Sequence, residues 1–156
     1  MMAVDVTTEI DIERPSQEVA RYVADPSNAT EWYANIRSIE WVTTPPLQVG
    51  TVVSFVARFL GRQLAYDYEI VELEPGARLV MRTAQGTFPM ETTYTWRPNA
   101  GGTHMTLRNR GEPVGFAGWL APLMAPAMRR ANRADLRRLR TILEARPRSQ
   151  ELDERT

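Results

Sequence analysis

The chain has 156 residues, 43% of them apolar, and equal numbers of basic and acidic residues, so its formal net charge is zero. These values predict one globular domain with its own core, and they argue against a disordered chain and against generic nucleic-acid binding. Cysteine and lysine are absent and His104 is the sole histidine, which excludes disulfides, cysteine nucleophiles and lysine Schiff bases. We expect no metal ion or other cofactor.

The N-terminal third predicts one strand followed by two short helices. The strand covers residues 3–13, and its apolar side chains share one phase of the alternation: Val4, Val6, Ile10 and Ile12. Pro15 suits the first position of a helix, which the run Asp25–Asn28 then ends. A second short helix is predicted over residues 29–34.

The middle of the chain alternates apolar and polar residues, which is typical of strands with one buried face. A strand over 36–43 precedes a loop that contains Pro45, Pro46 and Gly50. Turn residues then separate five further predicted strands, over 51–60, 62–74, 77–84, 88–98 and 102–111. This order predicts an antiparallel meander.

One long helix is predicted from about Gly115 to Arg146, and the polar residues 147–156 are expected to form a flexible tail. Pro122 and Pro126 interrupt the start of this helix. The segment 114–120 is therefore interpreted as a loop packed against the sheet edge. The alternatives are a gate over a pocket or a lip that contacts a membrane transiently.

The acidic N-terminus lacks the apolar core of a signal peptide. The longest uncharged run, Val114–Met128, has 15 residues and two prolines, whereas a membrane span needs about 20 apolar residues. We therefore expect a cytoplasmic protein without a transmembrane segment.

A sheet curved around one amphipathic helix tends to leave a cavity, and the predicted inward faces mix aromatic, methionine and hydroxyl side chains. Tightly packed cores use mainly Val, Ile and Leu. Tyr66, Tyr68 and Tyr94 each carry a phenol that needs a hydrogen-bond partner if it is buried. These rings are interpreted either as core residues with hydroxyls at the rim or as the lining of a pocket.

A helical wheel of the last helix places Asn132 and Asp135 within its apolar arc. A buried carboxylate is costly unless it is paired or hydrated. Asp135 is therefore predicted to meet an arginine or tyrosine of the sheet, the favoured alternative, or to border a wet cavity. The opposite, arginine-rich side is expected to be solvated, with anionic lipids or a partner protein as alternatives.

Recognisable catalytic motifs are missing from the sequence: it has no phosphate-binding loop, no metalloprotease motif and no nucleophile elbow. His104 falls on the polar outer phase of its strand. The remaining acid–base candidates that face the interior are Asp135, Tyr66 and Tyr94.

Two segments carry a resemblance to a known family: IDIERPSQEVARYVADPSNATEWY, residues 10–33, and YDYEIVELEPGARLVMRTAQGTFPMETTYTW, residues 66–96. With GGTHMTLRNRGEP, residues 101–113, and the closing helix, they resemble the bacterial polyketide cyclase/dehydrase-like branch of the START and birch-pollen-allergen superfamily. The resemblance covers about residues 3–146. It implies a single helix-grip domain over residues 1–146, of the α+β class, with a seven-stranded antiparallel sheet curved around the long helix.

The resemblance also implies a hydrophobic cavity that binds a lipid-like or polycyclic small molecule. Its lining would comprise Trp32, Phe55, Phe59, Tyr66, Tyr68, Phe88, Met90, Tyr94, Met124, Met128, Asn132 and Asp135. The alternatives are a cyclase or dehydratase acting on a polyketide-like substrate in the same cavity, and, more weakly, a protein-interaction module. Cyclases of the superfamily use pocket arginines, but Arg58 and Arg108 are predicted to point outward.

Overall fold

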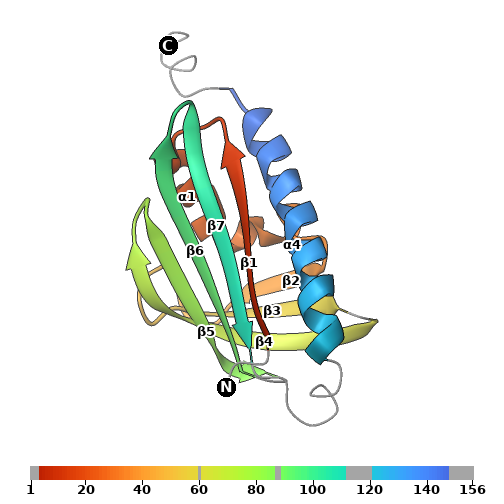
Figure 1. Ribbon diagram of the computed structural model, residues 1–156. Coiled ribbons are helices and arrows are strands. Elements are labelled where there is room, and N and C mark those ends of the chain that lie inside the picture. Colours follow the sequence, from red (N-terminus) through yellow and green to blue (C-terminus); the bar gives the residue numbers. More distant parts are fainter. Residues whose placement is uncertain (1–3, 60, 87–88, 112–120, 148–156) are drawn as a thin grey trace.

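The computed structural model describes residues 4–59, 61–86, 89–111 and 121–147, which form an antiparallel sheet gripped around one long helix (Figure 1). The strands are β1 Val4–Ile12, β2 Ile36–Trp41, β3 Val52–Phe59, β4 Arg62–Glu74, β5 Arg78–Gly86, β6 Met90–Asn99 and β7 Gly102–Gly111. The helices are α1 Ser16–Ala24, a 3-10 turn Pro26–Asn28, α2 Ala29–Trp32 and α4 Ala121–Glu144. The predicted helix-grip fold is confirmed.

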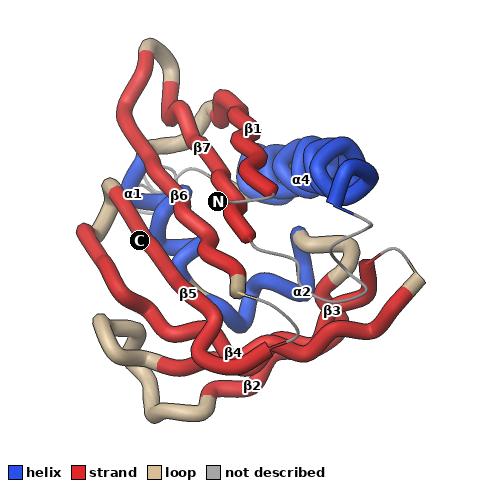
Figure 2. Tube along the Cα trace, turned by 60° about the horizontal axis from the view of Figure 1, so that its bottom comes forward, coloured by secondary structure: helices blue, strands red, loops and turns tan. Residues whose placement is uncertain are grey.

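The sheet has the strand order β1-β7-β6-β5-β4-β3-β2. Strands β2 to β7 form the predicted meander. Strand β1 pairs with β7 and becomes an edge strand of the sheet, so that Thr8 lies opposite Leu107. Figure 2 shows α4 beside β1 at the open side of the curved sheet, with α1 and α2 on the same inner side. The space between these two layers holds both the core and the candidate site.

Irregularities in the pairing of β4 with β5 help to explain the curvature of the sheet. The β4–β5 register shifts between Asp67 and Tyr68 and again between Ile70 and Glu72. An extra residue in one strand bends it and increases its twist. In Figure 1, β3 and β4 accordingly run across the direction of β6 and β7. The bent sheet leaves room between β4 and α4 that a flat sheet would close.

The two halves of α4 pack differently. Its C-terminal half buries Leu136, Leu139 and Leu143 almost completely in the main core. Its N-terminal half instead contributes Met124 and Met128 to a smaller cluster with Val4, Val6, Tyr66 and Met90. The leucines of the C-terminal half pack into the main core, whereas the flexible methionines of the N-terminal half border the cavity.

The C-terminal end of α4 is held by Arg14, which follows β1 and is only 7% exposed. One guanidinium nitrogen, Nη2, donates to the carbonyl oxygens of Glu144 at 2.7 Å and Arg146 at 2.5 Å. The other, Nη1, donates to the carbonyl of Glu13 at 2.8 Å. The last carbonyls of a helix have no partner within the helix, so Arg14 satisfies groups that would otherwise be orphaned.

The described part of the long helix begins at Ala121. Pro126 lies inside it, exposed and without an amide to donate. The predicted start near Gly115 and the segment 114–120, interpreted as a loop with a gate or a membrane lip as alternatives, lie outside the described residues. The second short helix is briefer than predicted, because it ends at Trp32.

Candidate functional site

A cavity of about 160 Å³ lies between the inner face of the sheet and α4. Side chains from β2 to β7, α1, α2 and α4 contribute to its wall, which is mainly aliphatic, aromatic and methionine. The sequence predicts a cavity of a few hundred Å³, within the usual range of about 300–1,000 Å³ for ligand pockets. The observed volume is smaller than this prediction.

Most of the side chains that the sequence analysis proposed for the pocket border this cavity. They are Trp32, Phe55, Tyr66, Tyr68, Met90, Tyr94, Met124, Met128, Asn132 and Asp135. Phe88 lies outside the described residues, and so does the side chain of Phe59. Whether the bordering residues bind a ligand stays a prediction.

The structure adds polar wall residues that the sequence analysis did not propose: Tyr33, Asn35, Thr92 and Asn109. Two of these carried a usable signal. Thr92 shares the inward phase of Met90 and Tyr94, and Asn109 shares the phase of Met105 and Leu107, which are buried. Tyr33 carried none, because its backbone leaves α2 in an extended conformation and turns the ring into the cavity.

The phenols of the wall are paired with one another and with hydroxyl groups. The hydroxyls of Tyr33 and Tyr94 are hydrogen-bonded. Tyr68 is hydrogen-bonded to Thr92, whose Oγ1 donates to Asn109 Oδ1 at 2.8 Å. Burial raises the pKa of Tyr68 to about 12 and also raises the pKa values of Tyr33 and Tyr94. These phenols therefore stay protonated at neutral pH and can donate hydrogen bonds but cannot act as bases.

Tyr66, the third proposed acid–base candidate, is 8% exposed at the methionine end of the cavity. Burial raises its pKa, and the neighbouring Tyr68 adds to this increase. Like the other phenols, Tyr66 is protonated at neutral pH. Of the three proposed candidates, only Asp135 can then change its protonation state near neutrality.

Asp135 is 3% exposed and accepts one hydrogen bond, from the backbone N–H of Ala34, at 3.1 Å. Burial raises the pKa of this carboxyl to about 6, and the hydrogen bond from Ala34 and the charge of Arg138 only partly oppose the shift. The partner is thus neither of the sheet residues that the sequence analysis favoured, an arginine or a tyrosine. It is a backbone amide at the end of α2.

Asn132 lies one turn before Asp135 on α4 and is 5% exposed. Within the described part of the chain its Nδ2 has no hydrogen-bond partner, although it is buried and the residue borders the cavity. An unsatisfied buried amide costs about 1–3 kcal/mol. Asn132 and Asp135 therefore present a free donor and a carboxyl acceptor side by side to an apolar space.

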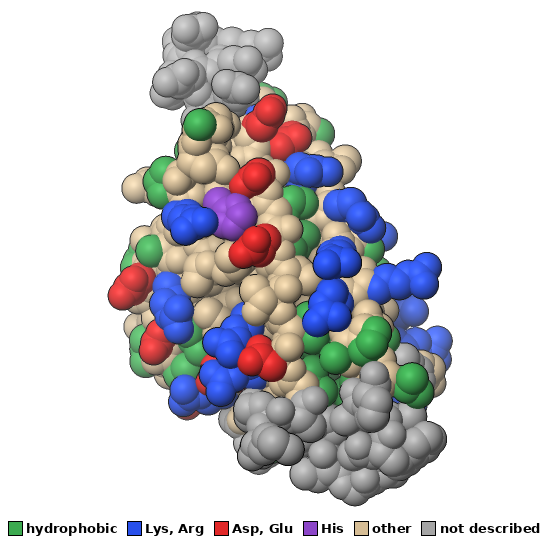
Figure 3. All heavy atoms as spheres, viewed as in Figure 1, with side chains coloured by type: hydrophobic (Ala, Val, Ile, Leu, Met, Phe, Trp, Pro, Cys, Tyr) green, Lys and Arg blue, Asp and Glu red, His purple; other side chains and the backbone are tan. Residues whose placement is uncertain are grey.

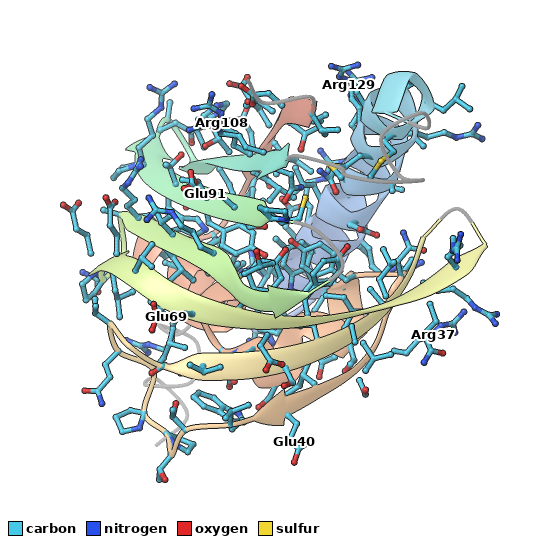
Figure 4. The ribbon with its side chains drawn as sticks, turned by 90° about the horizontal axis from the view of Figure 1, so that it is seen from below. Arg37, Glu40, Glu69, Glu91, Arg108 and Arg129 are labelled. Carbon is cyan, nitrogen blue, oxygen red and sulfur yellow. The ribbon has the colours of Figure 1, made fainter. Side chains whose placement is uncertain are left out.

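The charged side chains of the sheet lie outside the site, as predicted. His104 pairs with Asp11 at 2.8 Å, Arg108 pairs with Asp5, and Arg58 is exposed. Figure 4 shows Glu40 and Arg108 pointing away from the space between the sheet and α4.

The described residues contain no group of three side chains able to hold a metal ion, and no described helix is long and apolar enough to cross a membrane.

Solved structures share this architecture at low sequence identity. A protein from Thermus thermophilus superposes with a TM-score of 0.78 at 23% identity, over 91% of this chain and 99% of its own. The Zhui aromatase/cyclase from Streptomyces sp. R1128 gives 0.80 at 16% identity, over 96% and 98%. A START superfamily protein from Mycobacterium smegmatis gives 0.65 at 13% identity, over 85% and 97%. These similarities establish the fold alone.

Among curated proteins, none is significantly similar in sequence to this chain. The sequence does match the family model described as polyketide cyclase / dehydrase and lipid transport, and the match extends over residues 3–144. That range includes every described element of the sheet, α1, α2 and α4, as well as the whole cavity wall. The chain therefore belongs to the polyketide cyclase/dehydrase and lipid transport family.

Proposed function

We propose that this protein binds a hydrophobic small molecule in the cavity and holds the molecule's polar end at Asn132 and Asp135. The observation that carries the proposal is the unpartnered Nδ2 of Asn132, buried next to a carboxyl in an otherwise mostly apolar wall. Ligand sites typically combine an apolar lining with a few such polar groups. Family membership supports the proposal without naming the ligand.

The polar pair favours a hydroxyl group on the ligand. A hydroxyl can accept from Asn132 Nδ2 while it donates to the carboxylate of Asp135, and hydrogen bonds to charged groups contribute about 1.5–3 kcal/mol. The small cavity volume favours a flat molecule of one or two rings. Aromatic walls from Tyr66, Tyr68 and Tyr94 suit such a ring system.

A matched pair of ligands tests this arrangement. We expect 2-naphthol to bind saturably and about tenfold more tightly than 2-methylnaphthalene, which replaces the hydroxyl by a methyl group of similar size. Fluorescence titration measures both affinities. In Asn132→Leu the preference for the hydroxyl should shrink to less than about threefold. Equal affinities in the unmodified protein would contradict the polar anchor.

Occupancy of the cavity is tested separately by filling it. Ala131 borders the cavity, whereas Ala134 is exposed on the outer side of the same helix. Ala131→Phe should weaken 2-naphthol binding at least tenfold, because the new ring occupies the ligand's space. Ala134→Phe is the matched control and should leave binding unchanged. Equal effects of the two substitutions would place the ligand elsewhere.

An enzyme is the second candidate, favoured by one observation: burial brings the pKa of Asp135 to about 6, the range of a general acid or base at neutral pH. The Asp135 carboxyl, together with the protonated phenols of Tyr33 and Tyr94, supports a cyclase or dehydratase acting on a polyketide-like substrate. The aromatase/cyclase neighbour adds support by analogy of fold only. The test is to measure the dehydration rate of a linear β-hydroxy ketone as a function of pH. The rate should change around pH 6, and Asp135→Asn should abolish this change.

A further inference from the structure

Positive charge is concentrated on α4. Between Ala121 and Glu144 the helix contains six arginines and two acidic residues, so it carries a net charge of +4. The whole chain has a net charge of zero, which leaves −4 on the remainder. Figure 3 shows a row of basic side chains along α4 on the right of the molecule, while those over the sheet on the left lie among acidic side chains. The protein is therefore electrically polarised although it is neutral as a whole.

Five of these arginines define what we call the arginine stripe: Arg129, Arg130, Arg133, Arg137 and Arg140. Arg130, Arg133 and Arg137 are exposed, and the other two are partly exposed. Among the described residues none of the five side chains has a hydrogen bond or an ion pair. Three arginines of the sheet differ from the stripe, because Arg78, Arg82 and Arg108 pair with Glu72, Glu91 and Asp5.

The spacing within the stripe is unfavourable for an isolated helix. Arg129 and Arg133, and again Arg133 and Arg137, lie four residues apart, where like charges repel. On a solvated helix face, acidic residues usually lie between basic ones at this spacing. The sequence from Arg129 to Ala134 contains no acidic residue. An anionic surface would relieve the repulsion along the whole stripe at once.

An exposed apolar residue lies on the same face. Leu123 is 61% exposed and precedes Arg130 by seven residues, or almost two helical turns. At a membrane surface, such a side chain enters the headgroup region beside basic residues. A nucleic-acid backbone or an acidic protein surface gives it no comparable environment. We propose that the arginine stripe, with Leu123 at its edge, docks the protein on membranes rich in anionic lipid.

Docking in this orientation would also place the cavity near the lipid. Met124 and Met128, which border the cavity, belong to the same N-terminal half of α4 as Leu123. A hydrophobic ligand could then exchange between the bilayer and the cavity over a short distance. This last step rests on the proposed function, whereas docking itself depends only on the charge and exposure of α4.

Cosedimentation with lipid vesicles tests docking. We expect the protein to bind phosphatidylcholine vesicles that contain about 30% phosphatidylglycerol, and not pure phosphatidylcholine vesicles. The triple variant Arg130→Gln, Arg133→Gln, Arg137→Gln should lower the partition coefficient about a hundredfold. The control Arg78→Gln, Arg82→Gln, Arg108→Gln removes the same charge from paired positions and should change the coefficient less than about threefold. Equal losses would overturn the stripe as the docking surface.

Further measurements separate lipid from other polyanions and docking from ligand binding. Leu123→Ser should weaken vesicle binding several-fold without changing the melting temperature. Tighter binding to duplex DNA than to anionic vesicles, or a failure to bind those vesicles at low salt, would overturn the proposal. The triple variant should retain normal affinity for 2-naphthol. If the unmodified protein bound anionic vesicles but not 2-naphthol, the result would contradict the proposed function and leave the docking proposal intact.

Discussion

Replacement of Asp135 by Asn is expected to raise the free energy of unfolding by about 3 kcal/mol at pH 8 and to leave it nearly unchanged at pH 4. Burial raises the pKa of this carboxyl from 3.8 to about 6 in the folded protein. The folded state therefore disfavours the ionised form, and stability that is present below pH 3.8 is lost as the pH rises through 6. Asparagine cannot ionise, so the variant avoids this loss.

The substitution also keeps the local hydrogen bond. Ala34 donates its N–H to Asp135 Oδ1, and the amide oxygen of asparagine can accept the same bond. Urea unfolding at several pH values gives the measurement, and the melting temperature should rise by roughly 6–12 °C at pH 8. Glu40→Gln, which neutralises an exposed carboxylate on β2, should change stability by less than about 0.5 kcal/mol. A loss of stability in Asp135→Asn at pH 8 would show that a cation pairs with the carboxylate.

Arg14→Met is expected to lower the free energy of unfolding by about 2–4 kcal/mol. Methionine keeps the buried aliphatic stem but removes the donors that Arg14 gives to the carbonyls of Glu144 and Arg146. Those carbonyls would then be left without a partner at the end of α4. Amide hydrogen exchange should show faster opening of the last turn of the helix as well as the global loss.

A second arginine provides the control for this effect. Arg97→Met alters an exposed side chain on β6 and should change stability by less than about 0.5 kcal/mol. Arg14→Lys keeps a positive charge but has a single donor group, so it should recover only part of the loss. Equal urea midpoints for Arg14→Met and Arg97→Met would contradict this prediction. They would mean that water replaces Arg14 as the hydrogen-bond donor to the carbonyls at the end of α4.

Periodicity alone predicted most of the strands and the inward direction of several side chains. The two-residue repeat placed Tyr66, Tyr68, Met90 and Tyr94 on inner faces, where the structure puts them. The helical repeat likewise placed Asn132 and Asp135 inside. These assignments succeeded because each depends on the regular geometry of one element and on no contact between elements.

Properties that depend on contacts between elements could not be predicted in this way. The Ala34 amide that meets Asp135 lies 101 residues away in the chain, and no local pattern links the two. Tyr33 enters the cavity because α2 ends directly before it. The cavity volume depends on how all these side chains pack together, so the usual size of ligand pockets predicted more space than this sequence leaves.

The pairing of β1 with β7 has a consequence for folding of the chain during its synthesis on the ribosome. Val4 and Val6 are buried only after Gly111 and Asn109 have been made, which is roughly 5–20 s later at usual rates of synthesis. Throughout that interval β1 is a nascent strand without a partner, and such strands invite aggregation. Asp5, Glu9 and Asp11 alternate along it and are exposed in the finished fold. We expect these carboxylates to act as gatekeepers that keep the waiting strand soluble until its partner emerges.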